Sequence, residues 1–208
     1  MLELVSSIFI LFDLNSKLKM KNYLLFLFSF FLFSQCQSSS ESKWDTQIFE
    51  ALQKLEADQM TVNIKIDEEA FYPTQVPFNG TITLNEPSCF INLRNLDGGN
   101  IVISLEENDW YKAGDKTVYF KEGLTEVESM HGSFLIGRKD ELKGEGYIIN
   151  DGSFQLKQLN NEACIVTIKG NVKSPFDQSI IKPIEGFIVW KKPATLNSQE
   201  RVKTFFFN

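Results

Sequence analysis

The feature that most constrains the fold is a change of pattern after Met60. From there on, short runs rich in β-branched and aromatic residues alternate apolar with polar side chains, and turn-forming residues separate the runs. About ten such runs follow one another with short links. Short links can join antiparallel strands, whereas parallel strands need crossovers of a dozen or more residues. The pattern therefore predicts an all-β domain, either an antiparallel β-sandwich or a small β-barrel.

Residue types predict where several turns lie. Leu96-Asp97-Gly98-Gly99 is expected to close a hairpin between two apolar runs. Asn79-Gly80 is expected to form a turn, because this dipeptide tolerates positive φ. The same reasoning places turns at Asn150-Asp151-Gly152 and at Asn160-Asn161. A last strand is expected near Val202 to Phe207.

One short helix is expected ahead of the strands. Ser42 is in position to cap its N-terminus, with Asp45 three residues further on in a box-like arrangement. We expect one face of this helix to cover an end of the core rather than to bind a partner. The apolar residues of that face recur at helical spacing and are Trp44, Ile48, Ala51, Leu52 and Leu55.

An apolar run from Tyr23 to Phe33 precedes this helix. It is too short to cross a bilayer, which takes ~20 apolar residues, but it fits the central region of a secretory signal. Lys21 supplies the positive charge that such a signal carries in front of its apolar run. Because Met20 opens a conventional signal by itself, residues 1–19 are interpreted as an over-extended start; the alternative is a longer charged segment that the signal tolerates.

The end of this run, Phe33-Ser34-Gln35-Cys36, resembles the lipobox of bacterial lipoproteins. Ser34 and Cys36 match that pattern, while Phe33 stands where Leu is usual and Gln35 where Gly or Ala is usual. The resemblance implies that residues 20–35 are removed as a signal peptide and that Cys36 becomes lipidated. Residues 36–43 would then be a lipidated tether, with a single β-rich domain over residues 44–208.

The resemblance also implies a location. A lipidated Cys36 would attach the protein to a membrane of the bacterial envelope, facing the periplasm. Gln37 follows the cysteine where Asp signals inner-membrane retention in enteric lipoproteins, so the outer membrane is expected. The alternative is ordinary cleavage near Ser38-Ser39-Ser40, which would release a soluble secreted protein.

Charge argues against some partners. The chain has a formal net charge of −6 at pH 7, and its first 35 residues are slightly basic, so the remainder is more acidic still. An acidic surface repels phosphate backbones, and nucleic acid is therefore not an expected partner. Apart from the lipid anchor to the membrane, the sequence names no protein or small-molecule partner.

Two cysteines, Cys89 and Cys164, remain once Cys36 is assigned to the lipid. In an oxidising compartment an even pair can form a disulfide. The alternative is two separate buried thiols, because cysteine is among the most buried residue types. A redox or zinc site is not expected, since the sequence has no Cys-x-x-Cys pair.

No catalytic residues and no cofactor are predicted. His131 and Ser133 lie close in sequence but lack the Gly-x-Ser-x-Gly context of a nucleophile elbow. Two acidic clusters are interpreted as solvated turns rather than as catalytic carboxylates or a metal site. They are Asp67, Glu68 and Glu69, and Glu106, Glu107 and Asp109.

Aromatic residues beside turns are the last candidates for a binding surface, although a core role is preferred for them. They are Phe71, Tyr72, Trp110, Tyr111 and Trp190. We therefore expect a lipid-anchored envelope protein with a non-enzymatic binding or structural role. One alternative is a lipocalin-like carrier, since about eight strands can enclose a small apolar ligand. Another is a secreted hydrolase that uses acidic residues.

Overall fold

The computed structural model describes residues 40–73, 76–121, 130–140, 143–194 and 196–207. The predicted signal segment and Cys36 lie outside the described residues. Residues Trp44–Asn208 form one compact unit. Both buried clusters of apolar side chains lie within it, so this segment holds all of the described core.

The all-β prediction is confirmed. The strands are β1 (Met60–Ile66), β2 (Glu69–Ala70), β3 (Phe78–Asn85), β4 (Ser88–Asn95), β5 (Asn100–Glu106), β6 (Thr117–Phe120), β7 (His131–Asp140), β8 (Lys143–Leu159), β9 (Ala163–Lys173), β10 (Ile181–Lys191) and β11 (Leu196–Ser198). The helical elements are α2 (Ser40–Lys54), the short 3-10 helix η1 (Trp110–Lys112) and α3 (Glu200–Phe206).

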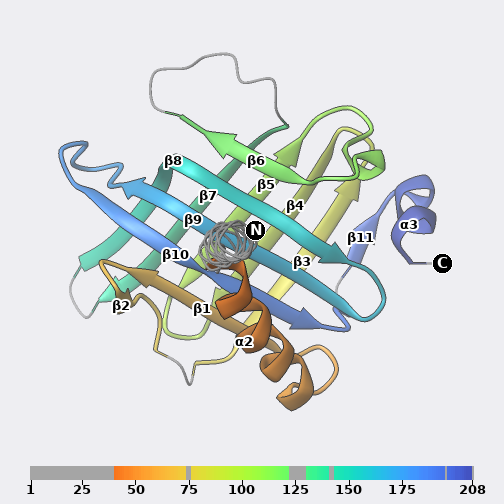
Figure 1. Ribbon diagram of the computed structural model, residues 1–208, viewed down its shortest axis with the longest axis horizontal. Coiled ribbons are helices and arrows are strands. Elements are labelled where there is room, and N and C mark those ends of the chain that lie inside the picture. The colour runs from red at the N-terminus through yellow and green to blue at the C-terminus, as the bar shows by residue number, and fades with distance from the viewer. Residues whose placement is uncertain (1–39, 74–75, 122–129, 141–142, 195, 208) are drawn as a thin grey trace, which may run out of the picture. The chain divides into compact units, whose positions relative to one another are not determined.

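The strands form one 11-stranded sheet that curls into a half-barrel (Figure 1). Its order is β11-β3-β4-β5-β7-β8-β9-β10-β1-β2, with β6 added beside β8. The pairs are antiparallel, apart from β11, which runs parallel to β3. In Figure 1, β8, β9, β10 and β1 pass in front of β3, β4, β5 and β7. Buried side chains from both parts belong to one core cluster.

Asn79-Gly80, which the sequence predicted as a turn, lies inside the sheet. That prediction was wrong, because both residues lie inside β3 and pair with Arg94 and Leu93 of β4. A Cβ at Gly80 would lie 2.5 Å from the Leu93 side chain and 3.1 Å from the Trp190 ring. The space at Gly80 is therefore limited by side chains of both β4 and β10, and the residue does not form a turn.

The predicted turn at Asn150-Asp151-Gly152 is also wrong, since these residues lie inside the long strand β8. Its first part, up to Ile148, pairs with β7, and from Ile148 onward it pairs with β9. β6 lies beside the second part, against Gly152 to Gln155. A bulge between Ile149 and Asp151 marks the change, and bulges bend strands. β8 is thus the strand at which the sheet turns its corner.

The helix predicted at the N-terminus is confirmed, although α2 begins at Ser40, so that Ser42 lies inside it rather than at its cap. Trp44 and Ile48 of its apolar face pack against Ile165 of β9 and Phe187 of β10. These four side chains belong to a cluster separate from the main core. The face therefore covers the outer side of the β9–β10 ladder, not an end of the main core.

The strand expected near Val202 to Phe207 is a helix, α3. Val202 is fully buried, and Phe206, one turn later, stacks on Trp110 at 5.4 Å between ring centroids. β-branched and aromatic residues favour strands, which is why this segment resembled one. Among the described residues, the helices are too short or too polar to span a membrane.

Candidate functional site

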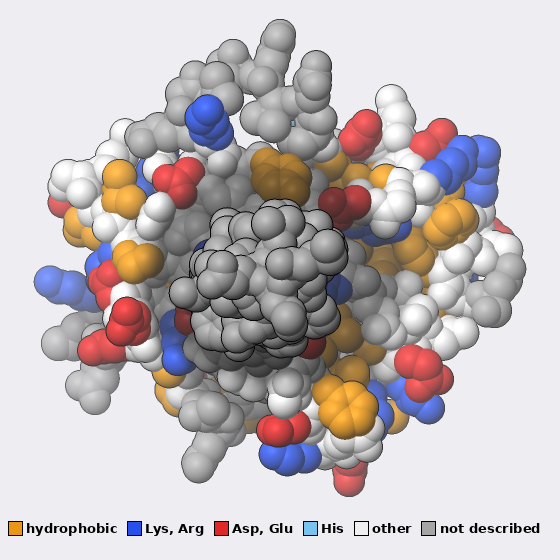
Figure 2. Space-filling model, in the orientation of Figure 1, with side chains coloured by type: hydrophobic (Ala, Val, Ile, Leu, Met, Phe, Trp, Pro, Cys, Tyr) orange, Lys and Arg blue, Asp and Glu red, His pale blue; other side chains and the backbone are white. Residues whose placement is uncertain are grey.

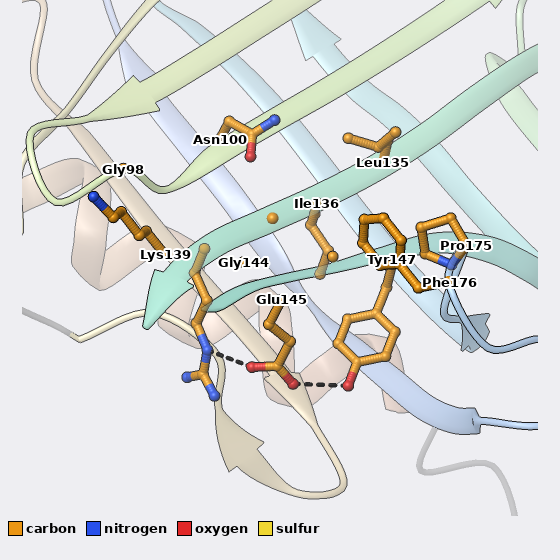
Figure 3. A pocket seen from close by; sticks show the side chains of 13 residues that line it. Gly98, Asn100, Leu135, Ile136, Lys139, Gly144, Glu145, Tyr147, Pro175 and Phe176 are labelled. Atoms are coloured by element: carbon orange, nitrogen blue, oxygen red, sulfur yellow. Dashed lines mark hydrogen bonds and ion pairs between the residues drawn. The ribbon is translucent and has the colours of Figure 1, made fainter. Parts of the chain in front are cut away.

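A groove of about 350 Å³ opens where β7 and β8 meet the link between β9 and β10 (Figure 3). Most of its lining is apolar. It is bordered by the β4–β5 hairpin, by the ends of β7 and β8 and by Pro175 and Phe176. The residues that line it are Gly98, Asn100, Leu135, Ile136, Gly137, Arg138, Lys139, Gly144, Glu145, Gly146, Tyr147, Pro175 and Phe176.

The groove runs past an open edge of the sheet. β9 pairs with β8 only as far as Ile148, which lies opposite Lys173. β8 itself continues to Lys143, and over this stretch its partner among the described strands is β7 alone. Residues from both faces of β8 line the groove, because the groove passes round this edge.

Glycines form the floor of the groove on one face. Gly137 of β7 lies directly opposite Gly146 of β8, and Gly144 is two residues before Gly146. The Asn100 side chain fills the space above Gly137, where a Cβ would lie 2.5 Å from its Oδ1. A Cβ at Gly144 would meet nothing within 4 Å, and one at Gly146 would approach only the Ile136 carbonyl, at 3.5 Å. The backbone of β8 is therefore accessible from this face.

Phe176 stands at the mouth of the groove with 84% of its surface exposed. Its loop is ordered by its own hydrogen bonds: the amides of Phe176 and Asp177 donate to Ser174 Oγ, at 3.2 and 3.4 Å. The Ser179 amide and hydroxyl then donate to Asp177 Oδ1. Leu96, at 87%, is also highly exposed and belongs to the hairpin that supplies Gly98 and Asn100. Large apolar side chains thus flank the groove on two sides.

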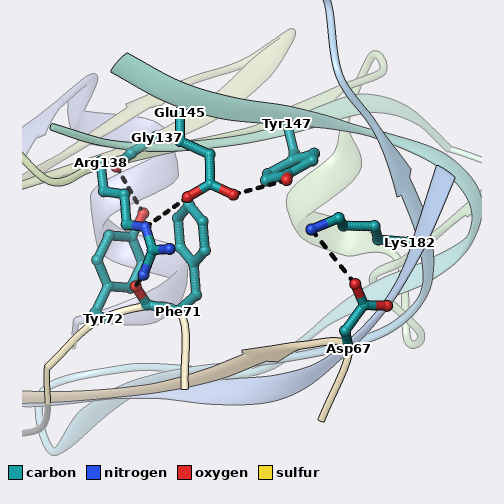
Figure 4. Close-up of polar contacts among 8 residues, drawn as sticks. All are labelled: Asp67, Phe71, Tyr72, Gly137, Arg138, Glu145, Tyr147 and Lys182. Atoms are coloured by element: carbon teal, nitrogen blue, oxygen red, sulfur yellow. Dashed lines mark hydrogen bonds and ion pairs between the residues drawn. The ribbon is translucent and has the colours of Figure 1, made fainter. Parts of the chain in front are cut away.

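The inner wall of the groove is a polar network (Figure 4). Arg138 donates from Nε to Glu145 at 2.7 Å and from Nη1 to the Phe71 carbonyl at 2.9 Å, while its guanidinium lies 4.7 Å from the Phe71 ring centroid. The Tyr147 hydroxyl donates to the other Glu145 oxygen at 2.7 Å. Nearby, the Lys182 ammonium pairs with Asp67 at 3.4 Å.

These contacts set the protonation states of the network. Partial burial alone would raise the pKa of the Glu145 carboxyl, but the hydrogen bonds from Tyr147 and Arg138 outweigh it, so the pKa lies below its ordinary value. Burial and the bond to Glu145 raise the pKa of the Tyr147 hydroxyl. At neutral pH the wall therefore holds an ionised carboxylate whose two oxygens are both occupied.

The aromatic residues singled out in the sequence are core residues. All five are at least 96% buried, and they are Phe71, Tyr72, Trp110, Tyr111 and Trp190. Tyr72 packs against Phe71 and Phe78, and its hydroxyl lies 2.7 Å from the Asn100 carbonyl. Phe71 contributes to the site through its contacts with Arg138 and through an edge-to-face contact with the Tyr147 ring, at 5.9 Å between ring centroids.

The titratable candidates from the sequence do not line the groove, although Asp67 pairs with Lys182 near its inner wall. His131 and Ser133 are exposed on β7, and Ser133 Oγ lies 2.8 Å from Ser104 Oγ. Asp109 bonds with Tyr111 and Lys112 at the start of η1. The other five acidic residues of the two clusters are exposed. Within the described part of the chain, three or more metal-binding side chains do not come together.

Cys89 of β4 and Cys164 of β9 are both buried in the main core and carry free thiols in this structure. Burial raises the pKa of Cys164 to about 12. Burial raises the pKa of Cys89 well above its ordinary value, and the charge that Cys164 would carry raises it further. The bridge between them stays a prediction.

Sequence reasoning missed the groove and its aromatic residues, Phe176 and Tyr147. One signal was available: Ser174-Pro175-Phe176-Asp177 places a large aromatic side chain in an otherwise polar turn. The charges visible on the face in Figure 2 are of both signs and interspersed, so that face has no single sign to identify a site. Comparisons of this chain with protein-family models, with curated proteins and with solved structures found no match.

Proposed function

We propose that this chain is a lipid-anchored protein of the bacterial envelope whose β-domain binds another molecule in the groove beside β8. The anchoring part of the proposal comes from the apolar run and the lipobox-like segment that ends at Cys36. The outer membrane is the proposed location, because Gln37 rather than Asp follows that cysteine.

The observation that carries the binding role is the exposed Phe176 at an apolar groove. Its ring contributes little to folding, because 84% of its surface faces solvent. Its loop is already ordered by Ser174 and Asp177, so little conformational entropy is lost when a ligand covers the ring. Aromatic anchors of this kind supply much of the binding energy at recognition surfaces.

Packing of the core supports a surface site over a carrier. Buried side chains of the two parts of the sheet form one cluster, and the Trp190 ring of β10 reaches to within 3.1 Å of where a Cβ at Gly80 of β3 would lie. A lipocalin-like carrier would instead need an apolar cavity inside the barrel. The groove lies beside β8 and is open to solvent along the edge of that strand.

An apolar, anionic dye, anilinonaphthalene sulfonate, tests the binding role. The probe is added to a fragment of residues 40–208, which contains α2 and both buried clusters. We expect saturable fluorescence enhancement that Phe176→Ala reduces several-fold. The matched control is Phe49→Ala, since Phe49 is also exposed, at 62%, but lies on α2. Equal enhancement in all three proteins would exclude the groove as the binding site.

A further inference from the structure

We propose that the groove binds an extended peptide segment of another protein, which adds to the sheet as a strand along the open edge of β8. This inference rests on the proposed binding role and names the class of partner. Its basis is the place where β9 ends, the space beside β8 and the charge around the groove.

The end of β9 leaves backbone groups of β8 available. Lys173 is the last residue of β9, and Pro175 follows, which has no backbone N–H to donate. From Lys143 to Tyr147, β8 pairs on one side with β7, and no other described strand pairs with it there. In such an edge, every second residue directs its N–H and C=O outward. A peptide in line with β9 would accept and donate these hydrogen bonds, as in β-strand addition.

The space beside the edge fits a peptide with large side chains. Gly144 and Gly146 meet no close neighbour where their Cβ atoms would lie, so the packing of this chain does not require glycine at either position. Glycine weakens a strand, and inside one it often marks a place where another backbone comes close. Apolar side chains at alternate positions of the peptide would fit over these glycines, between Leu135 and Phe176.

The charge around the groove is complementary to an acidic segment. Lys139, Lys143 and Lys173 surround the edge, and none of them has an ion pair with another described residue. Glu145, by contrast, is already neutralised by Arg138. Asp97 of the β4–β5 hairpin and Asp177 beside Phe176 are also exposed and have no ion pair with a described residue, but the three lysines outnumber them, and Lys143 and Lys173 flank the edge itself. The expected partner segment alternates apolar and polar residues and carries acidic ones.

Peptide selection followed by backbone methylation tests this inference. A display library of seven-residue peptides is selected against the fragment of residues 40–208. The best binder is labelled with fluorescein, and its affinity is measured by anisotropy with each amide N-methylated in turn. We expect alternation: methylation weakens binding about tenfold at every second residue, whose N–H faces β8, and much less at the residues between.

Substitution of the floor glycine supplies the second arm. Gly146→Val should weaken the selected peptide at least about tenfold, because its side chain occupies the space over the edge, while the melting temperature stays the same or rises. The matched control is Gly114→Val, at an exposed loop glycine that likewise has nothing within 4 Å of its Cβ position. That control should bind the peptide as the unaltered fragment does.

Three results would overturn the inference. One is a selected peptide whose binding does not alternate on methylation, and another is a library that yields no binder. The third is a concentration-dependent dimer that Gly146→Val abolishes, since the occupant of the edge would then be a second copy of this chain. If dye binding still depends on Phe176 in any of these cases, the groove binds a ligand and only the strand pairing is wrong.

Discussion

At the scale of single residues, the Asn150 side chain lowers the stability of the fold. Its side chain is 93% buried in the bulge of β8, and neither its Nδ2 nor its Oδ1 has a hydrogen-bond partner among the described residues. An unsatisfied buried polar group costs about 1–3 kcal/mol. An apolar side chain of the same shape would avoid this cost.

We therefore expect Asn150→Leu to raise the free energy of unfolding by about 1–2 kcal/mol, measured by urea denaturation. Leucine has the same number of side-chain heavy atoms and needs no partner. Asn171→Leu is the matched control, because Asn171 Nδ2 donates to Asp151 at 2.8 Å and its loss should destabilise the domain. A similar loss of stability in both variants would show that Asn150 has a role its surroundings do not reveal.

Glu145 makes the stability of the domain depend on pH. Its pKa is lowered in the folded state by Tyr147 and Arg138, so the unfolded chain binds the proton more readily. The stabilisation is present above the unfolded pKa, near 4.5, and is lost as the pH falls through the lower folded pKa. Between about pH 6 and about pH 3, we expect the melting temperature of Glu145→Gln to fall less steeply than that of the unaltered domain. Parallel profiles would contradict this assignment.

At the scale of elements, patterns that depended on neighbouring residues were predicted well. The hairpin at Leu96 to Gly99 and the helical face of α2 were both read correctly, because turn chemistry and a 3.6-residue period are local properties. The turns predicted at Asn79-Gly80 and at Asn150-Asp151-Gly152 were wrong because these glycines depend on contacts outside their own segments. In both places a Cβ on the glycine would lie too close to atoms of a paired strand, and such a glycine looks the same in a sequence as one in a turn.

The prediction of a strand where α3 lies was wrong because the composition of the segment was given more weight than its spacing. Val202 and Phe206 are four residues apart and face the core together, which is the helical period. Because α3 is short, the helical period occurs in it only once. The aromatic residues at its end, which favour strands, therefore decided the prediction. The same reasoning explains why longer periodic segments were identified more reliably.

The packing of α2 on β9 and β10 can be tested with adjacent residues of similar character. Ile48 is 6% exposed and packs in the smaller cluster, whereas its neighbour Phe49 is 62% exposed. Ile48→Ala should lower the free energy of unfolding by about 2 kcal/mol, and Phe49→Ala by less than about 0.5 kcal/mol. Chemical denaturation measures both. Equal effects would mean that the helix does not rest on this face in solution.

At the scale of the whole molecule, the site was the part least open to prediction. Gly98, Arg138, Gly146 and Phe176 come from four separate segments, and only the curl of the sheet brings them together. The open edge depends on where β9 stops relative to β8, which is a matter of register rather than of composition. The all-β class could be read from the chain, because it requires only alternation and short links.

Cys89 and Cys164 bear on the whole molecule because they lie on β4 and β9, in the two parts of the sheet that face each other. A bridge would close a loop of about 75 residues and stabilise the domain by about 4 kcal/mol in the chain-entropy model. We expect protein exported to an oxidising compartment to resist thiol alkylation in urea until a reductant is added. Labelling of both cysteines without reductant, read by mass spectrometry, would show that they remain thiols.

In the proposed function, Cys36 is the residue that holds the domain at a membrane. One acyl chain gives only marginal membrane binding, so stable anchoring needs a second chain or another signal. Lipoprotein processing places two or more chains on one cysteine. When the full chain is produced in a bacterial host, Cys36→Ser should abolish acyl labelling and detergent partitioning, while the folded β-domain keeps its far-ultraviolet circular dichroism. The matched control is Cys89→Ser. Cys89 lies in the core of the domain, so this variant should still be acylated at Cys36. If the unaltered protein carries no acyl label and its N-terminus lies at or after Glu41, Gln35 prevents lipobox processing and the protein is secreted in soluble form.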